Sequence, residues 1–277
     1  MAKALGIIGN IKGKVGNVVG YNLTDSNNKQ TQGLRVYQPN VKNPKTAAQA
    51  EQRAKLAPIN ATYRALKMII DRGNEGLPYG NKSRLAWLKK AFMAEGMPWI
   101  EKGGSVNYPV ICLLTKGSLN GLQFSVDGET VIVSAPGVTG STSLTTVGGL
   151  STALLASNPQ LKAGDQITIV IMEHGTNALK EDIYSFVIDT TSTEAFTKAE
   201  AAEDTISFKS SLSAEMGAVI VSREGDNGEH LRSTSFMAVT SDLLTAAPYN
   251  ATSKTAAIES YMASGSANTD WAEESIQ

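Results

Sequence analysis

The residues best suited to chemistry are few, and their spacing matches no catalytic or metal-binding motif. His174 and His230 are the only histidines, and Cys112 is the only cysteine. A zinc site needs three or four such ligands, and a nucleophile needs a base within hydrogen-bond reach. Neither histidine stands in a hydrolase motif, so both are expected at the surface, and Cys112 is expected to be buried. The sequence therefore predicts no enzyme, no metal site and no cofactor.

Two further patterns resemble known sites but differ from them in decisive positions. The segment from Gly9 to Val15 resembles a phosphate-binding loop. However, only three residues separate Gly9 from the Gly-Lys pair, where the motif has four, and valine stands where Ser or Thr would hold magnesium. Paired carboxylates occur at residues 181–182, 203–204 and 273–274. Adjacent acidic residues in polar turns are usually solvated, so these pairs predict no general acid or base.

The charge of the chain is divided between its two parts. The net charge is −1, but residues 1–116 hold 18 Lys and Arg against 6 Asp and Glu, whereas residues 117–277 hold 7 against 20. The basic part can face a polyanion such as nucleic acid, or it can meet the acidic part of a neighbouring copy. A third interpretation is that both parts are solvated surfaces. We favour self-association.

The first forty residues are rich in glycine. Five glycines alternate with β-branched residues over residues 6–20. Ordering glycine costs more conformational entropy than ordering other residues, so close backbone packing is needed to offset that cost. The pattern predicts an extended arm with a short strand over residues 1–40. We expect a subunit interface in this arm, formed by Gly13, Lys14, Gly16 and Gly20.

Residues 41–109 are expected to form a basic helical hairpin. Asn43 or Thr46 can cap a helix that runs to about residue 71, and Pro58 predicts a kink or break near Lys55. The apolar stripe of this helix has spacings of three and four, at Leu56, Ile59, Tyr63, Leu66 and Ile70. A second helix is expected over residues 81–94, with its apolar face formed by Leu85, Leu88 and Phe92.

From residue 110 the pattern changes to short strands. They are expected at residues 110–114, 122–126, 130–134, 166–172, 183–188, 218–222 and 235–239. Seven short strands separated by turns such as Asp127-Gly128 predict an immunoglobulin-like β-sandwich over residues 110–245. Residues 137–149 are expected to be a mobile loop before a short helix. Residues 246–277 are expected to hold a helix and a flexible tail. Trp271 in this tail is expected to contact a partner subunit, and the alternative is that the whole tail stays exposed.

Two motifs in the basic part point to a family. Residues 6–21 read GIIGNIKGKVGNVVGY and residues 43–56 read NPKTAAQAEQRAKL. Both resemble motifs of a family of uncharacterised proteins from gut anaerobes and their phages. The first family motif is G-I-x-G-x-x-x-G-K-V-G-x-V-V-G followed by an aromatic residue, and the second is N-P-x-T-x-A-Q-x-x-Q-R-A-K-F. Leu56 stands where that family prefers phenylalanine. The resemblance covers roughly residues 5–72 and implies no activity, but it does imply a virion or assembly component.

Together these patterns predict an α+β protein, with an N-terminal glycine-rich arm and helical hairpin followed by an immunoglobulin-like β-sandwich. No stretch approaches the roughly 18 apolar residues of a membrane span, and the first twenty residues lack the apolar run of a signal peptide. We expect a non-enzymatic structural protein of a phage virion, made in the host cytoplasm. It would form a homo-oligomeric ring, collar or tail layer with other virion proteins. The alternatives are an adhesion module and a nucleic-acid-binding packaging factor.

Overall fold

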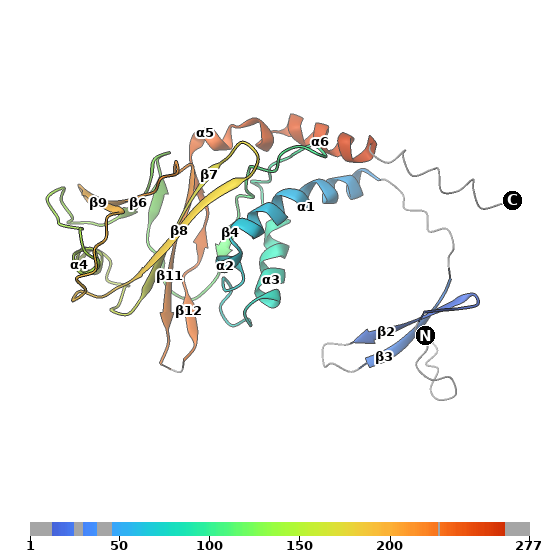
Figure 1. Cartoon of the computed structure of the whole chain (residues 1–277), viewed down its shortest axis with the longest axis horizontal. Coiled ribbons are helices and arrows are strands. Elements are labelled where there is room, and N and C mark those ends of the chain that lie inside the picture. Colours follow the sequence, from blue (N-terminus) through green and yellow to red (C-terminus); the bar gives the residue numbers. More distant parts are fainter. Residues whose placement is uncertain (1–12, 25–29, 38–45, 227, 264–277) are drawn as a thin grey trace. The chain divides into compact units, whose positions relative to one another are not determined.

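The computed structural model describes residues 13–24, 30–37, 46–226 and 228–263 (Figure 1). The chain divides into two compact units, Met1–Lys45 and Thr46–Gln277. Helices make up 28% of the described residues and strands 31%, and the described sheets are antiparallel, so the predicted α+β class is confirmed.

The first unit contains a three-stranded sheet in the order β1-β2-β3. Its strands are β1 (Gly13–Val15), β2 (Val18–Thr24) and β3 (Gln30–Val36). Gly16 has a φ of +60° and lies in the two-residue turn between β1 and β2. That left-handed conformation favours glycine in a tight hairpin. The sequence predicted one extended arm and a short strand, whereas the described residues form three paired strands.

The second unit begins with the helices α1 (Ala47–Ala65), α2 (Lys67–Ile70) and α3 (Asn81–Ala91). The Thr46 hydroxyl accepts a hydrogen bond from the backbone N–H of Gln49 at 3.3 Å, as predicted for the helix cap. α1 continues through Pro58, so the predicted break near Lys55 is wrong. Pro58 is buried on the packed face of α1, and the packing of that face outweighs the lost hydrogen bond.

The predicted apolar faces of the helices are correct only in part. Leu56 and Leu85 are 42% and 49% exposed, although the sequence placed them on buried faces. α3 instead buries Ser83, Trp87 and Ala91. The bulky indole of Trp87 decides which side of α3 faces the core, because it has much more apolar surface to bury than a leucine side chain.

Two larger sheets follow in the second unit. The first has the order β5-β6-β10-β9, with strands Phe124–Val126, Thr130–Ser134, Thr205–Lys209 and Ala199–Ala202. The second has the order β12-β11-β7-β8, with strands His230–Arg232, Met216–Glu224, Gln166–His174 and Leu179–Val187. Three short strands complete the set: β14 (Ala238–Val239), which pairs with β11, and the pair β4 (Leu113–Thr115) and β13 (Ser235–Phe236).

Three of these strands and one buried segment were not predicted from the sequence. β9, β10 and β12 are short, and β9 reads AEAA, a sequence of low β-propensity that pairing with β10 nevertheless holds extended. The loop predicted at residues 137–149 is shorter than predicted and partly buried. Val138 and Leu144 are buried in it, and α4 (Val147–Ser157) begins within it.

The β12-β11-β7-β8 sheet is covered on both faces (Figure 1). Along β7, Ile169 and Ile171 belong to the core shared with the other large sheet and α4. Val170 and Met172 belong to a second core, formed with α1, α2 and α3. All four side chains are fully buried. Burial on both faces explains why β7 is nearly continuously apolar rather than alternating.

The chain then returns to the helical layer through α5 (Ser241–Leu244), the short 3-10 helix η1 (Ala247–Tyr249) and α6 (Ala251–Ala263). α6 lies alongside α1 (Figure 1). The Lys254 ammonium is 3.4 Å from the Glu51 carboxylate of α1. The helical layer therefore combines segments from the two ends of the second unit.

Candidate functional site

The predicted interface residues of the arm gather in the β1–β2 hairpin. Gly13 is paired with Gly20, and Gly16 forms the turn between the two strands. A Cβ on Gly16 would meet nothing within 4 Å among the described atoms, so glycine is needed there for the turn rather than for close packing. The Lys14 ammonium lies 3.7 Å from the centre of the Tyr37 ring. Trp271 lies outside the described residues.

The three-stranded sheet has two chemically different faces. Val18 is paired with Val36, and Gly20 with Leu34. Directly paired residues share a face, and so do alternate residues along a strand, so these four residues lie together. Val18, Leu34 and Val36 are 37%, 49% and 71% exposed. We call this surface the apolar face of the hairpin sheet.

The opposite face of the hairpin sheet is basic and aromatic. Lys14 and Arg35 both lie opposite Val19 in the register. The Tyr21 ring lies over Gly33, where an added Cβ would come within 2.7 Å of the ring. No described residue of the first unit covers the apolar face in the same way. A small sheet of this kind needs a covered hydrophobic face to be stable.

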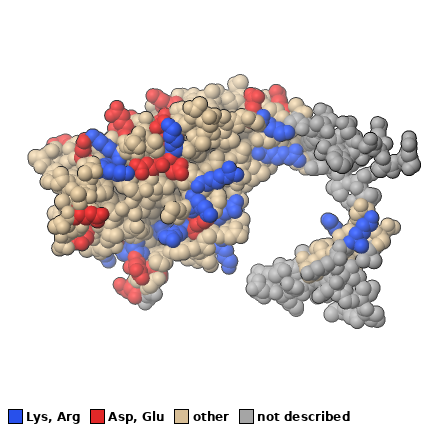
Figure 2. All heavy atoms as spheres, viewed as in Figure 1, with Lys and Arg blue, Asp and Glu red and all other residues tan. Residues whose placement is uncertain are grey.

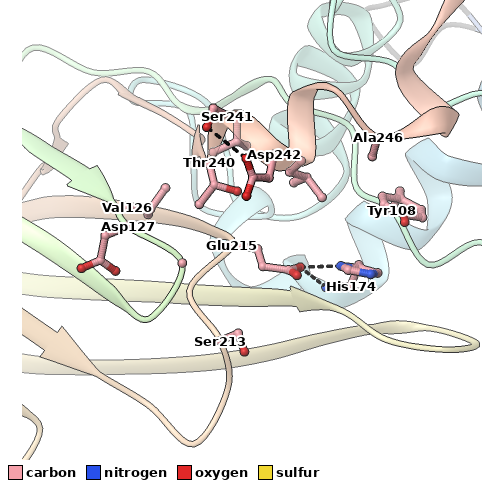
Figure 3. A pocket seen from close by; sticks show the side chains of 13 residues that line it. Tyr108, Val126, Asp127, His174, Ser213, Glu215, Thr240, Ser241, Asp242 and Ala246 are labelled. Carbon is pink, nitrogen blue, oxygen red and sulfur yellow. Dashed lines mark hydrogen bonds and ion pairs between the residues drawn. The ribbon is translucent and has the colours of Figure 1, made fainter.

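A pocket of about 540 Å³ in the second unit holds the histidine most suited to chemistry (Figure 3). His174 Nδ1 lies 2.6 Å from Glu215 Oε2, and the same oxygen accepts the backbone N–H of His174 at 2.9 Å. The Tyr108 ring stacks on the imidazole, with centroids 4.9 Å apart and planes at 14°. The His174 side chain is 37% exposed, as predicted for a surface histidine, but a carboxylate and an aromatic ring hold it in place.

A histidine and a carboxylate form two parts of a catalytic triad, and the third part is the nucleophile. Among the described residues, His174 has no hydroxyl or thiol within hydrogen-bond distance. Ser213 lines the pocket, but its side chain lies apart from the imidazole (Figure 3). Burial raises the pKa of the Cys112 thiol to about 12, and Cys112 belongs to the core beneath the helices. The arrangement suits a structural clamp between β7 and the segment before β11.

The carboxylate pairs from the sequence have separate structural tasks. Glu181 and Asp182 are neighbours on β8, so their side chains point to opposite faces of the sheet. Asp182 accepts hydrogen bonds from Lys198 at 2.9 Å and from Ser210 at 2.7 Å. Asp204 accepts the Gly137 backbone N–H at 2.8 Å. The pair at residues 273–274 lies outside the described part of the chain.

The hydrogen bond between His174 and Glu215 could not be found from the sequence, because the two residues are 41 positions apart. Within the described ranges, no three His, Cys, Asp or Glu side chains gather closely enough to hold a metal ion. No helix in the described part of the chain has the length and apolarity to cross a bilayer. Comparison with protein-family models, curated proteins and solved structures finds no match.

Proposed function

We propose that this chain is a non-enzymatic structural protein of a phage virion, and that copies of it assemble into a ring, collar or tail layer. The observation that carries the proposal is the apolar face of the hairpin sheet, with Val18, Leu34 and Val36 exposed. A face of this kind marks a protein contact. Covering it with a neighbouring copy stabilises the sheet and joins the subunits at the same time.

The proposal includes an immunoglobulin-like sandwich at residues 110–245. If β5 to β12 are lettered A, B, C, C′, D, E, F and G, the two large sheets have the orders A-B-E-D and G-F-C-C′. These orders correspond to those of immunoglobulin-like domains. Such domains serve widely as rigid building and binding modules, which fits a structural protein. The family resemblance of residues 5–72 supports the phage setting.

The charge division supports association between copies. The acidic residues 117–277 of one copy can face the basic residues 1–116 of the next, which would set the orientation of the subunits. Exposed pairs contribute little singly and are screened beyond about 8 Å at physiological salt, so many must act together. Assembly should therefore weaken as salt rises.

Mass photometry of the full chain tests the assembly. We expect particles at multiples of 29.3 kDa for the wild type, and monomers for a double variant with Leu34→Asp and Val36→Asp. The matched control is Met68→Asp on α2, where the side chain is 78% exposed, and it should assemble like the wild type. A wild-type chain that stays monomeric at low salt and high concentration would refute the proposal. Immunogold labelling of purified phage particles tests the virion setting, and unlabelled particles would contradict it.

One observation favours a second candidate, a packaging or assembly factor that contacts nucleic acid. Lys and Arg side chains gather over α1, α2 and α3 on the face shown in Figure 2. Phosphate contacts by such side chains give binding that falls steeply with salt. Retention of double-stranded DNA by the monomeric double variant would favour this candidate, whereas loss of retention together with assembly would not.

A further inference from the structure

The second unit has an apolar groove between the end of α3, the start of β4 and the end of α5. We call it the α3–β4 groove. Its floor includes the buried residues Ile111 and Cys112, and its volume is about 500 Å³. Around it stand Met93, Phe236 and Leu244, which are 85%, 54% and 52% exposed. Large apolar side chains gathered around one hollow mark a binding surface.

The groove also carries a cation that lacks a carboxylate partner. Lys90 lines it and donates a hydrogen bond to Asn74 Oδ1 at 3.1 Å, and among the described residues no carboxylate pairs with Lys90. Burial lowers the pKa of Lys90, and the nearby charge of Lys116 lowers it further. Glu95 is the one acidic residue in the described lining. A carboxylate brought by an occupant would stabilise the ammonium form of Lys90.

The helix beside the groove reinforces this preference for an acidic occupant. α3 carries no acidic side chain and four basic ones, which are Lys82, Arg84, Lys89 and Lys90. The groove therefore suits a segment that combines a large apolar side chain with several carboxylates.

We propose that the α3–β4 groove binds residues 264–277 of a neighbouring copy, with Trp271 as the anchor. This segment has three carboxylates, at Asp270, Glu273 and Glu274, no Lys or Arg, and Trp271 as its one aromatic residue. A tryptophan buries about 150–250 Å² and is one of the residue types enriched at the energetic centre of interfaces. The inference rests on the proposed homo-oligomer, because it assigns the segment to another subunit.

The path of the chain favours the neighbouring copy over the same chain. Leu244, at the end of α5, lines the groove, and α6 then leads away from α5 alongside α1 (Figure 1). α6 has 13 residues, which corresponds to about 20 Å of helix. To reach the groove of its own subunit, the segment from residue 264 to Trp271, which spans at most about 28 Å, would have to run back along the roughly 20 Å of α6.

A peptide-binding experiment tests the groove directly. The probe is a fluorescent peptide with the sequence of residues 264–277, and the receptor is the full chain with Trp271→Ala, which removes the competing anchor. Anisotropy should show binding, and a peptide with Trp271→Ala should bind at least tenfold more weakly. Receptors that also carry Phe236→Asp, or separately Met93→Asp, should lose at least tenfold in affinity. Met68→Asp is the matched control and should change affinity less than twofold, with circular dichroism reporting that each variant is folded.

Cross-linking decides which subunit supplies the segment. The photoreactive residue benzoylphenylalanine, placed at position 271 of the full chain, should give a cross-linked product of twice 29.3 kDa, joined near Phe236. Absence of peptide binding, equal binding to the groove variants, or cross-links confined to a single chain would each overturn the inference. A chain that assembles through the hairpin sheet but does not bind the peptide contradicts this inference alone. A monomeric chain that binds the peptide contradicts the proposed assembly.

Discussion

Ile171 and Met172 are sequence neighbours on β7, yet they belong to different cores. Both are fully buried, so replacing either by alanine should destabilise the second unit by about 2–5 kcal/mol. In an ordinary sandwich with one face of each sheet in water, only one of two adjacent positions would have this effect. The pair therefore tests the arrangement of helices and two sheets in layers.

The size of this effect can be measured by thermal and urea unfolding. For a domain of this size, 1 kcal/mol shifts Tm by about 2–4 °C, so each variant should lower Tm by about 4–20 °C. The urea midpoint should fall with an unchanged slope. The matched control is Val187→Ala on the neighbouring strand β8, where the side chain is 49% exposed, and the expected change is below about 0.5 kcal/mol. If Met172→Ala behaves like this control, the helical layer does not cover the sheet.

Two further predictions concern the segment between β4 and β5, which lies against Arg232 of β12 and Glu75 of the α2–α3 connection. Gly117→Ala should lower the free energy of unfolding, measured with urea, by about 3 kcal/mol, because the new Cβ would overlap the Arg232 carbonyl oxygen. Gly121→Ala is the control and should cost less than about 0.5 kcal/mol, because its Cβ has only ordinary contacts from 3.5 Å. Equal costs for the two variants would contradict the close approach of Gly117 to Arg232. Burial raises the pKa of Glu75, but hydrogen bonds from Ser118 and Arg232 outweigh it, so the pKa lies below its ordinary value. Its contribution is present above the unfolded pKa of about 4.3 and is lost as pH falls through the lower folded pKa. Glu75→Gln should cost about 1–2 kcal/mol at pH 7 and little at pH 2, and a loss independent of pH would contradict this account.

The sequence predicts the elements of the second unit better than their faces and partners. β6 has the predicted bounds, and the α6 region was expected as a helix, because strong local patterns mark these elements. The exposure of Leu85 and the burial of Trp87 depend on which side of α3 meets the core. Local periodicity does not determine that choice when several apolar residues compete for the same face.

For the candidate sites too, the sequence predicted local backbone structure but not the contacts between distant residues. Glycine and β-branched residues predicted extended backbone near Gly13 and Gly20, but not that Gly16 would turn the chain into a hairpin. The contact between His174 and Glu215 depends on strand pairing between distant segments, so no spacing rule could find it. The α3–β4 groove is likewise formed by residues from α3 to Leu244, which only the tertiary fold brings together.

The two units differ in how they can be stabilised. The second unit has two apolar cores, one on each face of the β12-β11-β7-β8 sheet, and both are buried by residues of that unit itself. In the first unit, Leu34 and Val36 are exposed, and no described residue of that unit covers the apolar face of its sheet. The stability of the second unit and the proposed assembly through the first unit should therefore be separable. Substitutions at Ile171 or Met172 should change the unfolding of the second unit without changing the proposed contacts of the hairpin sheet. Substitutions at Leu34 or Val36 should change those contacts without changing the unfolding of the second unit.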